Sequence, residues 1–563
     1  MKKNINQIDL ISHTCKGPEL SKLVIALSSG LLGFSIFSNT CYAATITVNT
    51  TSDNTQQLGE GDCSLREAIQ SINLQGENGC EASGLPFGNN DTIDIDAAGT
   101  IVLENFGLTI SQGVDITING LDTVIDGSNN IENVLSVDSA TLTMDEISIS
   151  NADTGISASA SNITLENCEL TGNNDYGLIA FDSSNVSIDS CTVSGNGTLT
   201  AGFGVGVRDD SSLQVSNSFI TQNLGMGASN GRNSNLVIET STVSQNSRGG
   251  VGALDGGTST TTINNSTISG NSGSLFGGIG TSDTVHILRL NNSQVTNNFS
   301  STSGGGIISN SAYIENSIVS GNSVTDFGGG IVVNGVIGSL TIRNSEISDN
   351  YAGRRAAGIY VQSRPVNIEN TTISGNVTPG IAGGSGAGGG LFFHGYVEGS
   401  FRHITVANNS AVNGAGIYAQ SFVFGSNISP SLSFSNSIIG DSEVGFDCVR
   451  SDNSVSVNTD TVSIIELDNC STNARNIDPK LLPLAINGSS TSTHGLLISS
   501  PAVNAAPAST CLQRDQRNVL RDIATDARCD IGAFESGFES NSNGDTLFYV
   551  IPLDDDKTVI IPL

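Results

Sequence analysis

A nine-residue pattern of hydrophobic and polar positions recurs along the chain. It reads aliphatic, any residue, Asn, Ser, any residue, Ile or Val, Ser or Thr, any residue, Asn, as in IENSIVSGN from Ile314, IRNSEISDN from Ile342 and INNSTISGN from Ile263. Looser copies begin at Met144, Leu165, Ile188, Val215, Ile238, Leu290, Ile368, Phe401 and Phe434. The twelve copies follow one another at spacings of 21 to 33 residues, and repeats of this length indicate a solenoid.

Each repeat is expected to contain three short strands. A glycine-led strand precedes many copies, as in GGGIVVN from Gly328 and GGGLFFH from Gly388. The two aliphatic positions of the pattern are five residues apart, whereas inward-facing side chains of one strand are an even number apart. The chain must therefore turn between them, at the Asn-Ser pair. One repeat thus predicts one coil of a three-sided parallel β-helix, rising by roughly 4.8 Å. A β-propeller is the alternative, but its repeats need about 40 residues.

The Asn that closes each copy should occupy equivalent points of successive coils. We expect these residues to form a ladder of side-chain amides, since Asn tolerates left-handed turns and bonds to neighbouring backbone. A structural role is favoured over ligand binding. They are Asn173, Asn196, Asn223, Asn246, Asn271, Asn298, Asn322, Asn350, Asn376 and Asn409.

The two ends of the chain differ from the repeats. Ser64-Leu65-Arg66-Glu67 is a capping box, and apolar residues follow at helical spacing, so a short amphipathic helix should cap the first coil. After residue 441 the repeat fades and several prolines indicate irregular structure. The last residues, 538–563, read as a polar linker followed by a β-hairpin, a sorting signal or a strand that pairs with a partner.

Residues 1–43 are predicted to be a secretory signal peptide. The segment combines four lysines with the apolar run 23–37 and small residues near Ala43. No second apolar stretch is long enough for a membrane span. We divide the remainder into an N-terminal cap (44–90), the β-helix repeats (91–441), an irregular C-terminal region (442–537) and the tail (538–563).

Composition narrows the classes of partner. The net charge is −32, so nucleic acid and anionic membranes, which require a basic patch, are excluded as partners. Charged residues are only 13% of the chain, which argues against an acidic disordered protein. The absence of EF-hand loops and of glycine-rich nonapeptides leads us to expect no structural calcium, and we expect no other cofactor.

Eight cysteines follow the predicted cleavage site and form four pairs adjacent in sequence. Because an exported protein meets an oxidising environment, four disulfides are expected. Cys168 and Cys191 occupy the Ser position of adjacent repeats, so they should face the core and form a bond across one coil; two buried thiols are the alternative. No spacing typical of a zinc site occurs. The pairs are Cys63 with Cys80, Cys168 with Cys191, Cys448 with Cys470, and Cys511 with Cys529.

Two stretches resemble known families. Thr45 to Asn73, with the heptad CSLREAI from Cys63, resembles the CSLREA domain of secreted bacterial β-helix proteins. Ile477 to Glu535 resembles the choice-of-anchor Q domain, with departures at Asn518, where Gly is usual, and Asp522, where Pro is usual. The glycine-led strands are weakly similar to repeats of polymorphic outer-membrane proteins. The resemblance implies a right-handed parallel β-helix of pectin-lyase-like shape, exported and surface-associated in a bacterium, and it implies no established reaction.

Two classes of function remain. The first is a non-enzymatic binding or adhesion protein that contacts polysaccharide or a cell surface, favoured by a rigid exported rod without an evident catalytic constellation. The second is a polysaccharide lyase or hydrolase, which would need paired carboxylates or a calcium cluster with a basic residue. A groove with clustered acids and a base would favour the enzyme, and a flat Ser/Thr/Asn face would favour binding. We assign no catalytic residues; the charged and histidine candidates are Arg208, Asp209, Asp210, Asp326, Asp349, Arg354, Arg355, His286, His394, His403 and His494.

Overall fold

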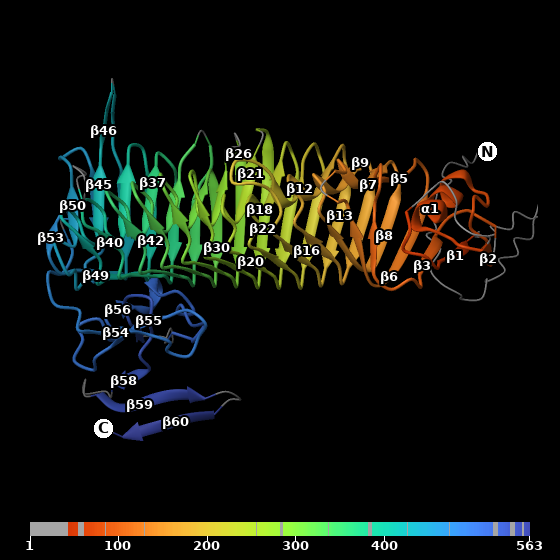
Figure 1. Cartoon of the computed structure of the whole chain (residues 1–563). Coiled ribbons are helices and arrows are strands. Elements are labelled where there is room, and N and C mark those ends of the chain that lie inside the picture. The colour runs from red at the N-terminus through yellow and green to blue at the C-terminus, as the bar shows by residue number, and fades with distance from the viewer. Residues whose placement is uncertain are drawn as a thin grey trace, which may run out of the picture.

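The computed structural model describes residues 43–53, 61–84, 86–128, 130–254, 256–281, 285–335, 337–380, 386–424, 426–471, 473–521, 527–540, 546–553 and 557–562. Most of them form one long stack of parallel β-coils, and the C-terminal region lies beside one end of this rod (Figure 1). Each coil contributes one strand to each of three faces. The expected all-β, three-sided parallel β-helix is therefore confirmed, and the propeller is excluded.

The first face holds the strand that ends near the aliphatic residue opening each copy of the pattern. Its strands are β1 (Ala44–Val48), β3 (Asp91–Ile95), the first part of β6 (Asp115–Asp126), the first part of β8 (Thr141–Ser150), β10 (Asn162–Glu166), β13 (Asn185–Asp189), β16 (Ser212–Ser216), β19 (Asn235–Glu239), β22 (Thr258–Asn264), β26 (Val285–Asn291), β30 (Ser311–Glu315), β34 (Leu340–Arg343), β38 (Val366–Glu369), β42 (Glu398–Arg402), β48 (Ser431–Ser435) and β51 (Ser456–Thr459).

The second face follows immediately after the Asn-Ser turn. Its strands are β4 (Thr100–Val102), the last parts of β6 and β8, β11 (Glu169–Thr171), β14 (Thr192–Ser194), β17 (Phe219–Thr221), β20 (Thr242–Ser244), β23 (Thr267–Ser269), β27 (Gln294–Thr296), β31 (Ile318–Ser320), β35 (Glu346–Ser348), β39 (Thr372–Ser374), β43 (Thr405–Ala407), β49 (Ile438–Gly440) and β52 (Ile464–Ile465).

The third face is a 15-stranded sheet formed by the glycine-led strands and their equivalents. Its strands are β5 (Leu108–Ile110), β7 (Asn133–Asp138), β9 (Thr154–Ser159), β12 (Tyr176–Phe181), β15 (Phe203–Val207), β18 (Met226–Gly231), β21 (Val251–Leu254), β25 (Ile279–Thr281), β29 (Ile307–Ser309), β33 (Ile331–Val333), β37 (Ile359–Gln362), β41 (Leu391–His394), β45 (Ile417–Gln420), β50 (Cys448–Arg450) and β53 (Asp468–Asn469). Between the second and third faces lies a six-stranded sheet of two-residue strands: β24 (Ser272–Gly273), β28 (Phe299–Ser300), β32 (Ser323–Val324), β36 (Tyr351–Ala352), β40 (Val377–Thr378) and β44 (Ser410–Ala411).

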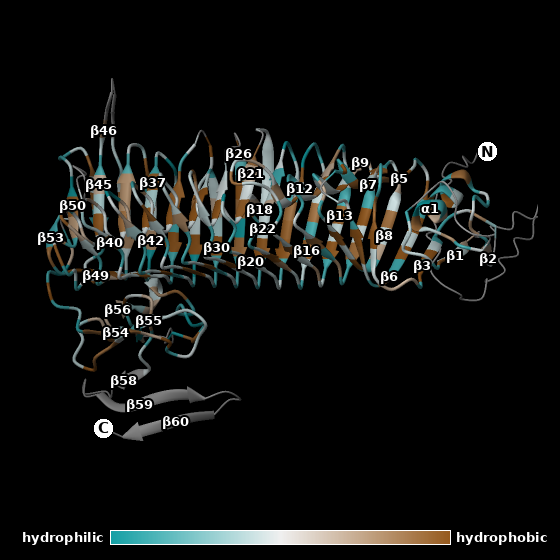
Figure 2. Cartoon of the chain, viewed as in Figure 1, coloured by the Kyte–Doolittle hydropathy of each residue, from teal (hydrophilic) through white to brown (hydrophobic). Residues whose placement is uncertain are grey.

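The register of the coils follows the nine-residue pattern. The aliphatic or aromatic residues that open the twelve copies, from Met144 to Phe434, pair in one continuous column along the first face. The coils also extend beyond the expected limits of 91 and 441, since β1 pairs in parallel with β3 and β51 with β48. Figure 2 shows the alternation of apolar and polar positions along the strands that buries this column.

The Asn-Ser turn works as the sequence predicts. In the repeat from Ile314, Asn316 has φ +48°, in the left-handed region, and Ser317 then points into the core, where it is fully buried. The left-handed residue breaks the alternation of the strand, because it adds one outward position before the chain resumes the extended conformation. Val319 is therefore also buried, and a second left-handed residue, Gly321 at φ +65°, returns Asn322 to the core.

The ten closing asparagines form the expected ladder. All are buried, and each side-chain amide from Asn173 to Asn376 donates to the side-chain oxygen of the next Asn at 2.9–3.1 Å. That oxygen also accepts the backbone N–H of the preceding Asn, as between Asn298 and Asn322 at 3.0 Å. The ladder thus satisfies backbone groups that the turn would otherwise leave unpaired in the core.

Cys168 and Cys191 are buried thiols, so the disulfide predicted between them is wrong. They belong to a second ladder, in which the backbone N–H of one coil donates to the hydroxyl of the next, as from Ser218 to Ser241 at 3.0 Å. Each thiol points back toward a carbonyl two residues earlier, at 3.1 Å, as the serine hydroxyls do. Side chains stacked in register run parallel, so the two sulfurs lie side by side as a hydrogen-bonded pair of thiols and not in the geometry of a disulfide.

The other three cysteine pairs are disulfides. Cys63–Cys80 encloses helix α1 (Leu65–Leu74), Cys448–Cys470 joins the last two coils, and Cys511–Cys529 lies in the C-terminal region. The helix begins with the predicted capping box, in which Ser64 and Glu67 bond reciprocally. Its buried face covers the first coil and closes the open end of the sheet stack.

Arg66 fixes the N-terminal cap to the rod. Its guanidinium pairs with Asp53 through two hydrogen bonds of 2.8 Å and donates to the carbonyls of Phe106 and Gly107. The Asp53 side chain is almost fully buried, and its second oxygen also accepts the Glu104 N–H. The Arg of the CSLREA-like heptad therefore has a structural role: it links the helix to a loop on each side.

The C-terminal region folds back onto the second face of the rod (Figure 1). Gln516 accepts a hydrogen bond from Thr372 at 2.7 Å, and Arg521, whose side chain is fully buried, contacts Asn370 at 3.2 Å. Asn518, which stands where the resembled domain has Gly, has φ +69°, so Asn replaces Gly at a left-handed position. Asp522 lies outside the described residues.

The remaining elements are short. They are β2 (Ala82–Gly84), which is antiparallel to β1, the hairpin β46 (Phe422–Phe424) and β47 (Ser426–Ile428), the hairpin β54 (Leu481–Ala485) and β55 (Thr493–Leu496), the pair β56 (Ala506–Pro507) and β57 (Arg528–Cys529), the 3-10 helix η2 (Ala508–Thr510), and an antiparallel sheet of β58 (Phe538–Ser540), β59 (Thr546–Leu553) and β60 (Lys557–Pro562). Residues 538–563 thus include the hairpin that was one of the expectations for the tail.

No helix in the described part of the chain is long and apolar enough to cross a membrane. The predicted signal peptide falls on residues 1–42 and the adjoining cleavage site, and residues 1–42 lie outside the described part of the chain.

Candidate functional site

Aromatic side chains form a row on the outer surface of the third face. Tyr360, Phe392 and Tyr418 come from the paired strands β37, β41 and β45, with ring centroids 5.4 and 5.3 Å apart. Phe327, in the turn before β33, continues the row at 5.4 Å from Tyr360. We call these four residues the aromatic row. They lie next to one another because equivalent positions of successive coils are adjacent, and neighbouring ring planes are tilted by 31–57°.

The aromatic row is partly open to solvent at its ends. Tyr360 and Phe392 are 5% and 1% exposed, whereas Phe327 and Tyr418 are half-buried. Phe422, at the base of the protruding β46–β47 hairpin, is 37% exposed and packs against His394 at 5.1 Å. The row and Phe422 therefore present ring surface beside the coils that precede the hairpin.

A row of polar side chains runs beside the aromatic row. Gln362, His394 and Gln420 occupy one outward position of β37, β41 and β45 and are partly exposed. The Tyr360 hydroxyl lies 3.3 Å from His394 Nδ1 and 3.4 Å from Gln362 Oε1. Burial and the charge of Arg355 lower the pKa of His394. A neutral imidazole can both donate and accept hydrogen bonds, as the two glutamines can.

Charged residues border the aromatic row on one side. Asp326 pairs with Arg354 at 3.3 Å, which uses two of the candidate residues in a single ion pair. Arg355 forms a backbone bridge between Phe327 and Ala387, and its charge reaches Tyr360 and His394. No ion pair of Arg355 occurs among the described residues. A cation thus stands beside the aromatic surface of a strongly acidic protein.

A second feature is a cleft between the last coils and the C-terminal region. It encloses about 590 Å³ and is lined by Asn408, Asp441, Ser442, Glu466, Leu467, Leu481, Leu482 and Pro483. Carboxylate oxygens of Asp441, Glu466 and Asp478 lie within 4.8 Å of one another. Burial and the neighbouring carboxylates raise the pKa of Asp441 to about 6. We call this feature the acidic cleft.

The remaining candidates lie elsewhere. Asp209 pairs with Arg232 at 3.2 Å and lies 3.7 Å from Arg208, and Asp210 beside it is exposed. The three candidates, Arg208, Asp209 and Asp210, therefore form a solvated turn. Asp349 occupies the left-handed turn after β35, where burial and Glu346 raise its pKa. None of these residues faces the aromatic row or lines the acidic cleft.

Three histidines are buried and serve the fold. His286 lies in the core, 3.0 Å from both Ser309 Oγ and Thr261 Oγ1, and burial lowers its pKa to about 4. His494 lies 2.8 Å from Ser374 Oγ and attaches the C-terminal region to the second face. His403 is buried at the same interface, 3.0 Å from the Asn436 amide.

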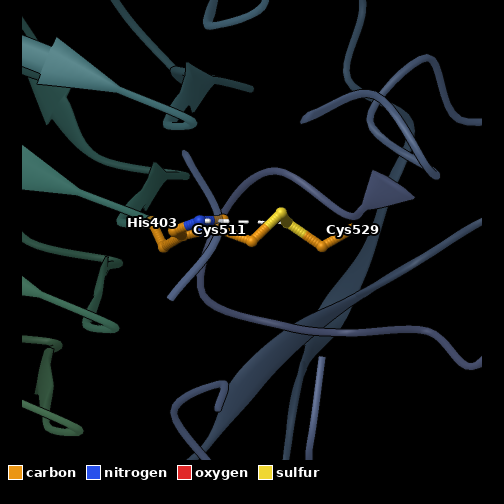
Figure 3. Close-up of side chains that lie close together, drawn as sticks. All are labelled: His403, Cys511 and Cys529. Carbon is orange, nitrogen blue, oxygen red and sulfur yellow. Dashed lines mark hydrogen bonds between the residues drawn. A yellow bond between two sulfur atoms is a disulfide. The ribbon is translucent and has the colours of Figure 1, made fainter. Parts of the chain in front are cut away.

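His403 also lies beside the Cys511–Cys529 disulfide, with its Nε2 atom 4.0 Å from the Cys529 sulfur (Figure 3). Three such residues would suit zinc only if both sulfurs were thiolates. The disulfide occupies both sulfurs, so this cluster is a covalent brace of the C-terminal region.

The second face is flat and rich in hydroxyl groups over its first coils. Outward side chains repeat as Thr-x-Ser or a close variant, and neighbouring coils bond across the sheet, as Thr221 and Ser244 do at 3.1 Å. Farther along, the C-terminal region covers this face.

The comparisons with known proteins agree with this architecture. A model of the family described as "right handed beta helix region" matches residues 24–293. The chain has the right-handed parallel β-helix fold. Its handedness is the one that the resemblance implied.

Several solved structures are similar to this chain at low identity. Pectate lyase Pel9A is 12% identical, with a TM-score of 0.29, over 88% of this chain and 97% of that chain. The periplasmic alginate epimerase AlgG is 9% identical, with a TM-score of 0.35, over 72% and 94%. The Dettilon tailspike protein is 12% identical, with a TM-score of 0.26, over 67% and 64%. Such values concern the fold alone, and no curated protein matches the sequence significantly.

Inspection of single residues missed the aromatic row. The signal was present in three successive glycine-led strands, AAGIYVQ, GGGLFFH and GAGIYAQ, whose second strand residue is aromatic and faces outward. A column of outward aromatics at one repeat position would have identified it. The acidic cleft left no such signal, because its three acids come from different segments.

Proposed function

We propose that the protein is an exported binding protein that holds a glycan chain on the third face, along the aromatic row. The observation that carries the proposal is the partly exposed rings of Phe327, Tyr418 and Phe422 beside a parallel row of amide and imidazole groups. Sugar rings offer apolar faces and many hydroxyls, so sites that bind them combine ring surface with a few oriented polar groups. Successive coils repeat these groups along the rod axis, which suits a chain of repeating units.

Export and cell-surface location are part of this proposal. They are supported by the signal-like residues 1–43, by the three disulfides and by the resemblance of both ends to secreted β-helix proteins. We prefer a binding function to a lyase or hydrolase activity because Arg354 and Asp326, a basic and an acidic candidate for catalysis, pair with each other. None of the described residues that line the acidic cleft is Lys or Arg, so the cleft lacks the base that a lyase requires.

Affinity electrophoresis against a panel of neutral and anionic polysaccharides tests the proposal. Tyr418→Ala and Phe422→Ala should each weaken retention by about tenfold, the effect of losing roughly 1.4 kcal/mol of contact. Phe219→Ala is the matched control, since Phe219 is an exposed aromatic residue on the second face. Equal retention by wild type and both variants on every retained polysaccharide would contradict the third-face site. Release of unsaturated uronides or reducing ends by the wild type would establish the enzyme alternative.

A further inference from the structure

The acidic cleft brings together three carboxylates from segments that meet at the end of the rod. Asp441 follows β49, Glu466 follows β52, and Asp478 lies where the chain leaves the last coil for β54. Their oxygens all lie within 4.8 Å of one another. Calcium ligands stand 2.3–2.6 Å from the ion, so two ligands on opposite sides are at most about 5 Å apart. The spacing of the three oxygens is therefore compatible with one such ion.

No Lys, Arg or His among the described residues forms an ion pair with this cluster of Asp441, Glu466 and Asp478. The nearest lysine in the sequence, Lys480, directs its ammonium to the backbone and hydroxyl of Ser499. Three carboxylates at such distances repel one another strongly, and a bound cation is the usual compensation.

A buried carboxylate behind the cleft supplies an independent indication. Asp447 is fully buried, and one of its oxygens accepts the Leu467 N–H at 2.7 Å. Its other oxygen, Oδ1, and the Ser442 hydroxyl, which lines the cleft, make no hydrogen bond of good geometry, although Ser442 lies close enough to lower the pKa of Asp447. The Asp447 charge reaches both Asp441 and Glu466. A buried carboxylate oxygen without a well-placed donor is costly, and a cation bound in the neighbouring cleft would offset part of this cost.

We propose that the acidic cleft binds one Ca²⁺ ion, held by the carboxylates of Asp441, Glu466 and Asp478 with the oxygens of Ser442 and Asp447 behind them. The donor set consists of oxygens alone, which suits a hard cation, and the open cleft leaves room for waters and the larger coordination shell of Ca²⁺ rather than Mg²⁺. The ion would join two coils of the rod to the segment that leads into the C-terminal region. This reverses the expectation of no structural calcium, which rested on motifs whose ligands are close in sequence.

Isothermal titration calorimetry of the full chain with CaCl₂, after treatment with chelator, tests the site. We expect one saturable site per chain, with a dissociation constant at or below about 1 mM, the weak limit for extracellular calcium modules. Ca²⁺ should also raise the thermal midpoint of the wild type. Mg²⁺ should bind at least about tenfold more weakly.

Asp441→Asn and Glu466→Gln, which preserve shape, should each weaken Ca²⁺ binding by at least about tenfold. Asp210→Asn is the control, since Asp210 is also an acid at a left-handed turn but lies far from the cleft in the repeats. Circular dichroism establishes that each variant is folded, and the two variants test the site independently. Absence of saturable binding by the wild type up to about 5 mM, or wild-type affinity in both variants, would overturn the proposal.

Discussion

His286 should make the rod sensitive to acid. The side chain is fully buried in the coil interior, where its ring nitrogens contact Ser309 and Thr261 and its backbone N–H donates to Asn310. The side-chain oxygen of Asn230 accepts from Thr261, so the groups that face the ring are neutral. Burial without a counter-charge lowers the pKa of His286 from 6.5 to about 4.

The sign of the effect follows from proton linkage. The unfolded chain binds a proton at His286 below pH 6.5, whereas the folded chain does so only near pH 4, so protons favour unfolding between these values. The stabilisation is complete above pH 6.5 and is lost as the pH falls toward 4. The difference between the pKa values of His286 in the unfolded and folded chains corresponds to roughly 3 kcal/mol of stability, of which about 2.5 kcal/mol is lost by pH 4.5.

Urea unfolding of wild type and His286→Gln at pH 7.5 and pH 4.5 isolates this contribution. Gln retains a donor and an acceptor but does not titrate, so the variant should lose about 2.5 kcal/mol less stability than the wild type between the two pH values. Any cost of the substitution at pH 7.5 cancels in this difference. The other buried histidines, His403 and His494, titrate in both proteins. Equal losses in wild type and variant would refute the argument that burial keeps His286 neutral.

Three further predictions concern stability. Asn298→Ala should destabilise the rod by about 2–4 kcal/mol in urea unfolding, because it leaves the side-chain amides of Asn271 and Asn322 without their ladder partner. Asn297→Gly, at the adjacent exposed left-handed turn, should be nearly neutral. Similar urea midpoints for the two variants would contradict this prediction. Arg521→Met should lower the free energy of unfolding by about 3–5 kcal/mol, since it leaves Glu535 buried without its partner at 3.0 Å. It should also make the C-terminal region sensitive to limited proteolysis, and an unchanged digestion pattern would show that Arg521 does not hold this region in place. Cys168→Ser should change stability by less than about 1 kcal/mol, since Ser fills this position in later coils. Alkylation of the unfolded, unreduced protein should label Cys168 and Cys191, while the native protein stays unlabelled. Recovery of a peptide in which the two cysteines are linked would show that they form a disulfide.

The two internal ladders show how a mainly aliphatic core accommodates polar groups. The Asn ladder and the Ser ladder stand at the two turns that flank the second face, where left-handed residues interrupt the strand pairing. Each rung satisfies a backbone N–H of the preceding coil. Because every interior coil has a neighbour on both sides, every interior rung is paired, and disruption of one rung leaves partners unpaired in two coils.

The repeat pattern was enough to predict the architecture of the rod. The five-residue offset within the pattern predicted a turn at the Asn-Ser pair, and Asn316 and Ser317 have the conformations that this offset requires. The columns of aliphatic residues and the Asn ladder followed from the repeat, because a solenoid places equivalent positions next to each other and so converts a sequence period into a spatial contact. The capping helix followed from local chemistry at Ser64 and Glu67.

Tertiary structure alone decided the contacts that do not follow the repeat. The acidic cleft brings Asp441 and Glu466 close to Asp478. The C-terminal region covers part of the second face and so buries His403 and Glu346, at positions that are exposed in earlier coils. Nothing in a linear pattern specifies how a non-repeating segment docks, since the docking depends on the shape of the whole face. The thiols of Cys168 and Cys191 illustrate the same limit at short range: the repeat placed them in adjacent coils, but the parallel direction of stacked side chains decided that they do not bond.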